Sequence, residues 1–439
     1  MSPVVAIVGK PNVGKSTLFN RIVGRRLAVT SPLPGVTRDR NYATTDWSGV
    51  GFILVDTGGF VPYTDEPVLK GVKRQVELAI EESDLIIFVV AHESVTGMDL
   101  EIAESLRKAA KPVVLAVNKV DNEKRELASS EFHSLGFANL NLVSGLHGRG
   151  VGDLLDEVIS RLSPSSEPEK EDRLRLAVIG RPNVGKSSLV NALLGEERVL
   201  VHESPGTTRD SIDTEIEYDG KKMTLVDTAG LRRKAKVKES LEYYTVLRSI
   251  RSVERCDVAL IMLDAAEGVA RQDKRIISLP LDFGKGIVIV ANKIDLLTDR
   301  RSAMERIERE LSFLDYYPLV PTSCTRREGI YDVLKLASVV SEDRMRRIGK
   351  NELSSFLTTL VEHRAPPSKG KRRAVISKIV QVGIKPPTFV MRVNKEELLN
   401  ENYLRYVRNS FRKRFSFVGT PIRLRVSEKN SKARRSRGR

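Results

Sequence analysis

The sequence has few cysteines, few aromatic residues and no long hydrophobic run. Its 439 residues include two cysteines and one tryptophan, and aromatic residues make up 5%. Two isolated cysteines exclude a disulfide-rich scaffold and a cysteine zinc finger, and they fit a reducing cytosol. No apolar stretch approaches the ~18 residues of a membrane span. The stretch Val4–Val8 is short and has no basic region before it, so no signal peptide is expected.

Acidic residues are outnumbered only near the C-terminal end. The chain carries 73 Lys and Arg against 57 Asp and Glu, a net charge of +16. Residues 341–439 hold 26 of the basic and 8 of the acidic residues, which gives +18 there and −2 for residues 1–340. A solvated surface is the simpler explanation for dispersed charge. A basic excess concentrated in one module is typical of a protein that binds a polyanion such as a nucleic acid.

The sequence repeats itself in the same order. Residues 9–17, GKPNVGKST, recur as residues 180–188, GRPNVGKSS, with seven of nine identical at an offset of 171. The segments PGVTRD (34–39) and DTGG (56–59) recur at the same offset as PGTTRD and DTAG. The segment NKVD (118–121) recurs as NKID (292–295), at an offset of 174. A unit of this length indicates a duplicated domain rather than a solenoid repeat.

Composition divides the chain into five predicted parts. The two copies occupy residues 1–162 and 173–341, and a basic module occupies residues 342–428. Residues 163–172 are rich in Pro, Ser and Glu, which predicts a flexible acidic linker. Residues 429–439 form a low-complexity basic tail.

Within each copy, runs of Val, Ile and Leu alternate with helical patterns. This alternation predicts an α/β fold whose mostly parallel sheet is covered by helices on both faces. The predicted strands are Val4–Val8, Phe52–Val55, Leu85–Ala91, Val113–Val117 and Leu140–Val143, and then Leu176–Ile179, Met223–Val226, Val258–Leu263, Ile287–Val290 and Leu319–Val320. Ligands of such sheets bind where the strands end, and the repeated motifs lie there.

The first repeated motif fits GxxxxGK[ST] and lies between a predicted strand and a helix. Its glycines let backbone N–H groups surround phosphates, and the helix N-terminus favours their charge. The lysine is expected to reach the β- and γ-phosphates, and the serine to place its hydroxyl on Mg²⁺. The predicted residues are Gly9, Lys10, Pro11, Asn12, Val13, Gly14, Lys15, Ser16 and Thr17, and Gly180, Arg181, Pro182, Asn183, Val184, Gly185, Lys186, Ser187 and Ser188.

The second motif, DxxG, is ordinary turn chemistry alone but indicates a nucleotide site after a phosphate loop. Its carboxylate suits a place beside Mg²⁺, and its last glycine suits a backbone N–H donated to the γ-phosphate. The predicted residues are Asp56, Thr57, Gly58, Gly59 and Phe60, and Asp227, Thr228, Ala229, Gly230 and Leu231.

The third motif, NKxD, predicts guanine recognition. Its carboxylate accepts hydrogen bonds from guanine N1–H and N2–H₂, a donor pair that adenine lacks. The lysine stem stacks on the base and the asparagine holds the loop, whereas an isolated NKxD is often only a capped turn. A later loop, here called the base loop (residues 144–146 and 323–325), is expected to offer backbone N–H groups to guanine O6. The predicted residues are Asn118, Lys119, Val120, Asp121, Ser144, Gly145 and Leu146, and Asn292, Lys293, Ile294, Asp295, Ser323, Cys324 and Thr325.

In this order the motifs resemble those of the translation-factor class of GTPases. Two tandem P-loop GTPase domains followed by a basic module resemble the Der (EngA) family of bacterial GTPases, over the whole chain. The resemblance implies a cytoplasmic, monomeric enzyme that hydrolyses GTP to GDP with Mg²⁺. It also implies a role in assembly of the large ribosomal subunit and binding to ribosomal RNA. Gly145 and Cys324 replace the usual alanine of the base loop, and both are compact enough for backbone recognition to survive.

By motif position, the resemblance implies that Thr37 and Thr208 are switch threonines on Mg²⁺. The implied metal-side residues are Ser16, Thr37, Asp56, Ser187, Thr208 and Asp227. The neighbouring Arg38 and Arg209 either reach the phosphates or lie solvated.

Both copies lack the glutamine that orients water in Ras-like GTPases, because Phe60 and Leu231 occupy that position. This predicts slow intrinsic turnover or a different catalytic device. In related potassium-activated GTPases an asparagine of the phosphate loop ligates K⁺, which makes Asn12 and Asn183 candidate K⁺ ligands. Alternatively, asparagine only tolerates the backbone geometry of the loop. The predicted catalytic residues are Asn12, Lys15, Thr37, Gly59, Asn183, Lys186, Thr208 and Gly230.

The basic module is predicted to be an α+β, KH-like domain. Strands at 373–382, 388–393 and 421–426 are expected with a helix at 402–415, whose Arg405, Arg408 and Arg412 form a basic face. No GxxG occurs in residues 341–439, so the backbone-clamping loop of RNA-binding KH domains is missing. Phosphate contacts, protein contacts and docking on the GTPase domains all remain open.

Three functions fit these motifs. The first is an enzyme in which GTP hydrolysis controls binding to an RNA particle. The second is a scaffold in which one copy only senses nucleotide. The third is a tRNA-modifying GTPase, which is disfavoured because the last 100 residues contain no cysteine.

Overall fold

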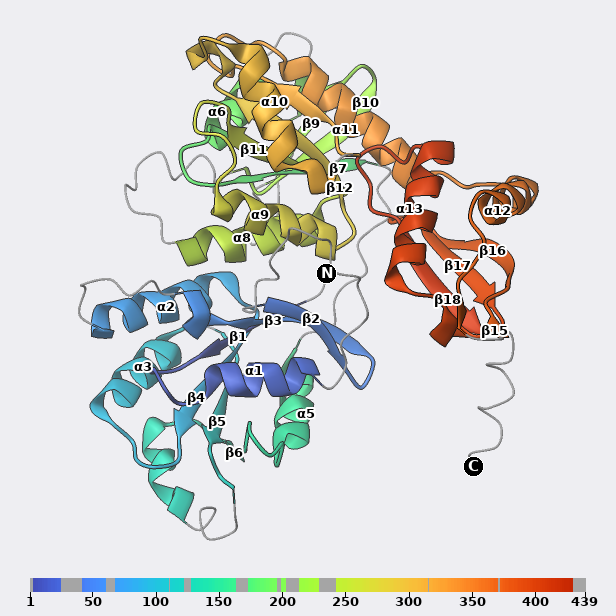
Figure 1. Cartoon of the computed structure of the whole chain (residues 1–439). Helices are drawn as coiled ribbons and strands as arrows, with labels where there is room; N and C mark the ends of the chain where they lie inside the picture. Colours follow the sequence, from blue (N-terminus) through green and yellow to red (C-terminus); the bar gives the residue numbers. More distant parts are fainter. Residues whose placement is uncertain are drawn as a thin grey trace. The chain divides into compact units, whose positions relative to one another are not determined.

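The computed structural model describes most of the chain (Figure 1). The described residues are 3–24, 42–60, 68–109, 111–121, 128–162, 173–195, 199–202, 213–228, 242–314, 316–369 and 372–428. They divide into two compact units. One contains the first repeat and residues 239–254, and the other contains the rest of the second repeat and the C-terminal module. Each is described by itself. No described helix is long and apolar enough to cross a membrane.

The described strands of the first repeat form one sheet in the order β2-β3-β1-β4-β5-β6. All neighbours are parallel except β2 and β3, which are antiparallel. The strands are β1 (Val4–Val8), β2 (Tyr42–Trp47), β3 (Val50–Asp56), β4 (Leu85–Ala91), β5 (Val113–Asn118) and β6 (Leu140–Leu142). The helices are α1 (Lys15–Gly24), η1 (Thr57–Phe60), α2 (Val68–Glu82), α3 (Gly97–Lys108), η2 (Ala128–Leu135) and α5 (Val151–Arg161).

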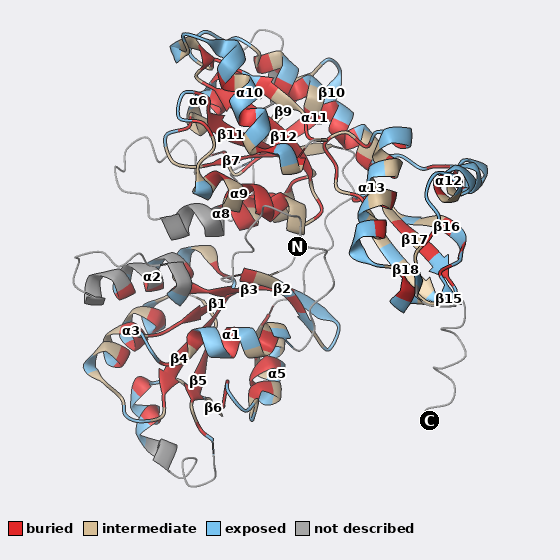
Figure 2. Ribbon diagram, in the orientation of Figure 1, coloured by how far each residue is buried: buried red, intermediate tan, exposed pale blue. Residues whose placement is uncertain are grey.

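Strand β1 is buried on both faces, as the sequence predicts (Figure 2). Val5 and Ile7 pack in one core cluster with residues of α1 and α5, whereas Ala6 and Val8 pack in a second cluster with residues of α2 and α3. Alternate side chains of a strand point to opposite faces, so a strand between two helical layers must be apolar at every position. The predicted mostly parallel sheet covered on both faces is therefore confirmed for this repeat.

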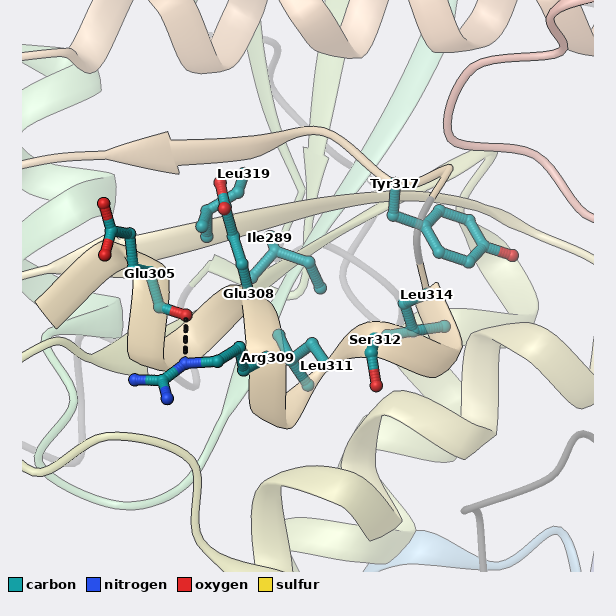
Figure 3. A pocket seen from close by; sticks show the side chains of 9 residues that line it. All are labelled: Ile289, Glu305, Glu308, Arg309, Leu311, Ser312, Leu314, Tyr317 and Leu319. Carbon is teal, nitrogen blue, oxygen red and sulfur yellow. Dashed lines mark hydrogen bonds between the residues drawn. The ribbon is translucent and has the colours of Figure 1, made fainter. Parts of the chain in front are cut away.

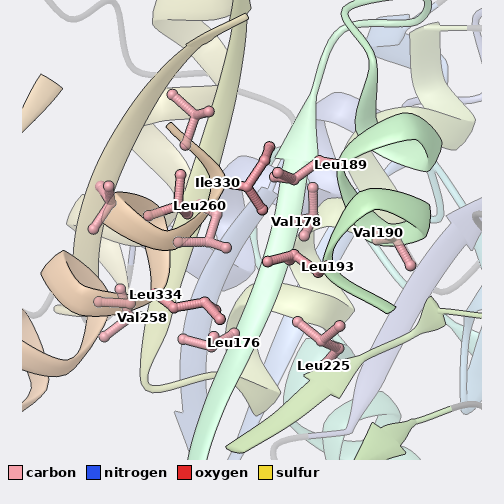
Figure 4. Packing of buried hydrophobic residues seen from close by; sticks show 14 of the residues in the cluster. Leu176, Val178, Leu189, Val190, Leu193, Leu225, Val258, Leu260, Ile330 and Leu334 are labelled. Carbon is pink, nitrogen blue, oxygen red and sulfur yellow. The ribbon is translucent and has the colours of Figure 1, made fainter. Parts of the chain in front are cut away.

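The second repeat forms the same sheet with one further strand, in the order β13-β12-β11-β7-β10-β9-β8. Its strands are β7 (Leu174–Gly180), β8 (Val199–His202), β9 (Thr214–Tyr218), β10 (Lys221–Val226), β11 (Val258–Asp264), β12 (Gly286–Asn292) and β13 (Leu319–Pro321). Its helices are α6 (Lys186–Leu194), α8 (Glu242–Arg255), α9 (Arg271–Asp282), η4 (Ile294–Leu296), α10 (Arg300–Glu310), η5 (Ser312–Leu314) and α11 (Ile330–Met345). Figure 4 shows Val178 of β7 near Leu189 of α6 and Ile330 of α11, and Leu176 lower on the same strand near Leu334 of α11.

The C-terminal module is an α+β domain, as predicted. Its main sheet has the order β16-β17-β18, with the first pair antiparallel and the second parallel. Its elements are α12 (Lys350–His363), β14 (Ser368–Lys369), β15 (Arg372–Arg373), β16 (Ile376–Gly383), β17 (Thr388–Val393), η6 (Glu396–Leu398), α13 (Glu401–Phe415) and β18 (Arg423–Glu428). Phe411 of α13 packs against Phe389 of β17 and against Phe356 of α12, so both helices share one core cluster with the sheet.

The expected basic face of α13 is only partly correct. Arg405 is exposed, but Arg408 pairs with Glu401. The guanidinium of Arg412 lies 3.0 Å from the ring centroid of Tyr316, in the second repeat. Arg412 is therefore held by a cation–π contact and does not contribute a freely solvated charge.

The second repeat and the C-terminal module share backbone hydrogen bonds. The N–H of Ile287 in β12 donates to the carbonyl of Gly419 at 2.7 Å, and the N–H of Gly419 donates to the carbonyl of Tyr316 at 2.9 Å. Helix α11 also crosses the predicted boundary between residues 341 and 342, and its buried Arg344 donates to the carbonyl of Gly284 at 2.8 Å. The two parts therefore form a continuous packed unit.

Replacing Gly419 by Ala should destabilise this second unit. Gly419 has a φ of +61°, and an added Cβ would overlap Val340 and lie 2.7 Å from the carbonyl oxygen of Ile287. Backbone strain and overpacking together should cost about 2–4 kcal/mol. Urea unfolding followed by circular dichroism should show an earlier transition. Gly383→Ala is the matched control, because its Cβ would meet only Thr388 at an ordinary 3.5 Å. Equal midpoints for both variants would contradict the close approach at Gly419.

Candidate functional site

The first phosphate-loop motif connects β1 to α1 in a conformation that requires its glycines. A Cβ on Gly9 would overlap the carbonyl oxygen of Val89, and one on Gly14 would overlap the amide nitrogen of Asn118. Asn12 has a φ of +65°, a left-handed conformation that asparagine tolerates better than most residues. The loop is thus shaped by close backbone approach, as a cradle for phosphate requires.

The second phosphate-loop motif has the same shape between β7 and α6. Asn183 again has a φ of +65°, and a Cβ on Gly185 would overlap the amide nitrogen of Asn292. A Cβ on Gly180 would lie 2.6 Å from the carbonyl oxygen of Met262. The repeated sequence therefore produces the repeated local geometry.

The lysine of each motif folds back over its own loop. Lys15 is buried, and its Nζ donates to the carbonyls of Gly9 at 2.8 Å and Lys10 at 2.7 Å. Burial lowers the pKa of the Lys15 ammonium, while the nearby Asp56 carboxylate raises it. Lys186 donates in the same way to the carbonyls of Gly180 and Arg181. Both ammonium groups therefore lie against the main chain of their own phosphate loops.

The metal side of the first site places a hydroxyl beside a carboxylate. Ser16 Oγ donates to Asp56 Oδ2 at 2.5 Å, and the N–H of Gly58 donates to Asp56 Oδ1 at 2.9 Å. Hydroxyl and carboxylate oxygens are the ligands that Mg²⁺ prefers. Within the described part of the chain, no group of three or more His, Cys, Asp or Glu side chains is placed to hold a metal. Ser16 and Asp56 therefore offer oxygen donors of the kind that Mg²⁺ prefers.

The corresponding part of the second site differs. Asp227 has a φ of +60°, and its N–H donates to Asp213 Oδ1 at 3.0 Å. Thr214 Oγ1 and Thr228 Oγ1 lie 2.7 Å apart nearby. The two repeats therefore reach the end of this strand with different backbone conformations.

The asparagine of NKxD joins the phosphate loop to the base loop. Asn118 Nδ2 donates to the carbonyl of Val13 at 2.8 Å, and its Oδ1 accepts from the N–H of Gly145 at 2.9 Å. In the second repeat, Asn292 Nδ2 donates to the carbonyl of Val184 at 2.9 Å and its Oδ1 accepts from the N–H of Cys324 at 3.1 Å. The structure thus brings together motifs that lie far apart in the sequence.

The aspartate of NKxD is oriented by the serine of the base loop. Ser144 Oγ donates to Asp121 Oδ1 at 2.8 Å, and Ser323 Oγ donates to Asp295 Oδ1 at 2.5 Å. The hydrogen bond from Ser323 lowers the pKa of Asp295, so this carboxylate stays ionised at neutral pH. Burial raises the pKa of the Cys324 thiol, within the base loop, to about 11, so this thiol stays neutral at neutral pH.

The lysines of NKxD are anchored by acidic side chains. Lys119 Nζ lies 3.0 Å from Glu93 Oε1, and Lys293 Nζ lies 2.6 Å from Asp264 Oδ2. Both lysines have a positive φ, +70° and +67°. The aliphatic stems are thereby held in place, as a lysine that stacks on a base requires.

Some predicted residues lie outside the described residues. These are the switch threonines Thr37 and Thr208, the arginines Arg38 and Arg209, and Ala229, Gly230 and Leu231. Gly59 and Phe60 are placed as the end of the short helix η1. Their proposed roles remain predictions.

Sequence reasoning missed the aspartates that pair with the second residue of each phosphate loop, a lysine or an arginine whose side chain is called the loop cation below. Lys10 Nζ pairs with Asp99 Oδ2 at 2.7 Å, and Arg181 Nε pairs with Asp273 Oδ1 at 2.8 Å. A signal was present, because Thr96-Gly-Met-Asp99 fits the pattern of a helix capping box.

A separate cavity of about 740 Å³ lies beside α10, away from these motifs (Figure 3). Its lining includes Ile289, Leu311 and Leu319, and also the exposed Glu305 and Arg309. None of its lining residues belongs to a phosphate, DxxG, NKxD or base-loop motif.

Comparison with known proteins finds two family models. The family "50S ribosome-binding GTPase" matches residues 4–119 and 175–293, once in each repeat. The family "KH-domain-like of EngA bacterial GTPase enzymes, C-terminal" matches residues 347–426.

Curated relatives match along nearly the whole chain. GTPase Der of Desulforamulus reducens is 45% identical, over 98% of this chain and 99% of the relative. GTPase Der of Desulfitobacterium hafniense is 47% identical, over 98% of both chains. GTPase Der of Geotalea uraniireducens is 45% identical, over 99% of this chain and 100% of the relative.

Replacing Asp295 by Asn should change base preference at the second site only. The variant loses two charge-assisted hydrogen bonds to guanine, about 1.5 kcal/mol each, so GDP should bind roughly a hundredfold more weakly. Xanthosine diphosphate should bind better, because its O2 accepts from the new amide. Fluorescence titration with GDP is read in a Lys15→Ala background, in which only the second site binds. For the first site, the matched experiment uses Asp121→Asn in a Lys186→Ala background. GDP affinity within twofold of the parent would show that Asp295 does not contact the base.

Proposed function

The chain belongs to the GTPase Der family. We propose that both repeats hydrolyse GTP, and that the bound nucleotide controls whether the protein binds the precursor of the large ribosomal subunit. The observation that carries the proposal is the doubled site. Each repeat joins a phosphate loop, a folded-back lysine and an NKxD asparagine at the carboxyl edge of a parallel sheet. Two such sites favour two working GTPase domains over one enzyme with one sensor.

We propose that Ser16 and Ser187 bind Mg²⁺ through their hydroxyls, with Asp56 and Asp227 accepting hydrogen bonds beside it. The metal, when bound, neutralises charge on the β- and γ-phosphates. The chain itself supplies loop N–H groups, Lys15 and Lys186 to the same phosphates. Catalysis of phosphoryl transfer rests largely on such positioning and charge stabilisation.

The catalytic device is proposed to include K⁺. Asn12 and Asn183 are both exposed on the phosphate loop, so their amide oxygens are open to a cation. Their shared φ of +65° is also satisfied by asparagine for backbone reasons alone. A cation at this place would supply the positive charge that an arginine finger provides in other GTPases. With no glutamine after DxxG, intrinsic turnover is expected to be slow.

Exchange of K⁺ for Na⁺ at equal ionic strength should slow hydrolysis several-fold. Phosphate release is measured separately for each repeat, with Lys186→Ala or Lys15→Ala silencing the other. Asn12→Ala should abolish the difference between the two salts in the first repeat, and Asn183→Ala should do so in the second. Equal rates in both salts for the parent would remove K⁺ from the proposal.

Binding to ribosomal RNA is proposed to use the outer face of the C-terminal sheet. Lys378, Arg392 and Arg425 are exposed on adjacent strands, and Lys378 lies directly opposite Arg392. Like charges opposite one another destabilise a sheet, and a polyanion relieves this repulsion. The single aromatic residue of these strands, Phe389, is buried. Phosphate contact, rather than base stacking, therefore suits this face.

Sedimentation with ribosomal subunits tests the switch. The parent should bind the large subunit with GTP or a non-hydrolysable analogue and release it with GDP. Reversing Lys378, Arg392 and Arg425 to Glu should weaken binding and lower the log–log salt slope by roughly 2–3, since each phosphate contact contributes about 0.7–0.9.

Arg405→Glu is the control for added negative charge, because this exposed residue lies on α13 and not on the sheet face. Binding of the parent that is equally strong with GDP and GTP would reduce the chain to a constitutive RNA binder.

A further inference from the structure

The second residue of each phosphate loop is a cation held by a buried aspartate. In the first repeat, Lys10 Nζ donates to Asp99 Oδ2 at 2.7 Å and to Thr96 Oγ1 at 3.1 Å. In the second, Arg181 Nε donates to Asp273 Oδ1 at 2.8 Å. Both aspartate side chains are 0% exposed. The pair of a loop cation and a buried aspartate therefore occurs twice, with a different cation in each copy. Arg181 also pairs with the exposed Glu267 at 3.0 Å.

Each aspartate is fixed by the helix on which it lies. Asp99 is the third residue of α3, and its Oδ2 accepts from the N–H of Thr96 at 2.9 Å. Asp273 is the third residue of α9, and its Oδ2 accepts from the N–H of Ala270 at 2.9 Å. A carboxylate in the first helical turn is further favoured by the helix dipole. The aspartate is thus a rigid anchor to which the loop cation is attached.

The main chain of the same loop residue contacts the phosphate-binding lysine. The carbonyl of Lys10 accepts from Lys15 Nζ at 2.7 Å, and the carbonyl of Arg181 accepts from Lys186 Nζ. One residue therefore joins the lysine to the helix anchor, through its carbonyl on one side and its side chain on the other. Movement of this residue would displace both the loop backbone and the lysine.

We propose that Asp99 and Asp273 are positioning residues, which act through Lys10 and Arg181 to hold each phosphate loop in its binding shape before nucleotide arrives. This inference rests on the proposed nucleotide sites. A loop that is already ordered loses less conformational entropy when it binds. Loss of the pair should therefore weaken GDP and GTP alike, because both carry the phosphates that the loop surrounds. Guanosine lacks phosphates and should bind as before.

The test measures nucleotide dissociation from the full chain in a Lys186→Ala background, which leaves the first site. Asp99→Asn and Lys10→Met each break the pair and should speed dissociation of GDP and GTP at least tenfold. Guanosine affinity, measured by competition, should stay within twofold. Lys10→Arg copies the cation of the second repeat and should recover most of the loss seen with Lys10→Met.

Two further variants sharpen the assignment. The double variant Lys10→Met/Asp99→Asn should release GDP no faster than the faster of the two single variants, because both residues act through one pair. Glu104→Gln removes the exposed ion pair with Lys108 on the same helix and should leave dissociation unchanged. Asp273→Asn in a Lys15→Ala background should affect the second site in the same way.

Thermal unfolding establishes which variants are folded. If Asp99→Asn does not fold, GDP dissociation from Lys10→Met tests the inference instead. If a folded Lys10→Met variant releases GDP within twofold of the parent's rate, the inference is overturned but the proposed nucleotide site is not. Equal losses for guanosine and GDP would also overturn it, because they indicate general loosening of the domain. A parent that binds no GDP would overturn the proposed nucleotide site and the inference together.

Discussion

The amide of the NKxD asparagine is the contact on which each candidate site depends. Asn118 donates to the carbonyl of Val13 and accepts from the N–H of Gly145, so one side chain joins the phosphate loop and the base loop. Gly14 must lack a Cβ because that amide occupies the space beside it. Asn292 makes the same contacts in the second repeat. The parallel sheet makes this possible, since it ends neighbouring strands at one edge.

Duplication preserved this framework but left room for differences around it. The first repeat anchors its loop cation as a Lys–Asp pair and the second as an Arg–Asp pair. Asp56 accepts a hydrogen bond from Ser16, whereas the backbone of Asp227 is left-handed and bonded to Asp213. The two copies therefore share the phosphate loop and the NKxD contacts, and they differ in the loop cation and in the backbone at the DxxG aspartate.

The second repeat differs in another way, because its sheet is joined to the C-terminal module. In strand β12 the N–H of Ile287 donates to the carbonyl of Gly419 in the module, and the strand ends at Asn292, which holds the base loop. The strand thus connects the candidate guanine site to the C-terminal part of the chain, whose residues 341–439 carry the net basic excess. A change at either end would act on the same buried strand, which is apolar and close-packed along its length.

The sequence by itself determined the buried strands and the motifs that follow them. A parallel strand covered on both faces must be apolar throughout, so β1 and β4 have the predicted bounds. The two phosphate loops were equally predictable, because their glycines are required by close backbone approach. Only the tertiary structure decided the rest. Strand β2 lies at a sheet edge and has a mixed polar pattern, so no hydrophobic run marks it. The partners of Lys10 and Arg412 lie far away in the sequence, and folding alone decides which charged side chains meet.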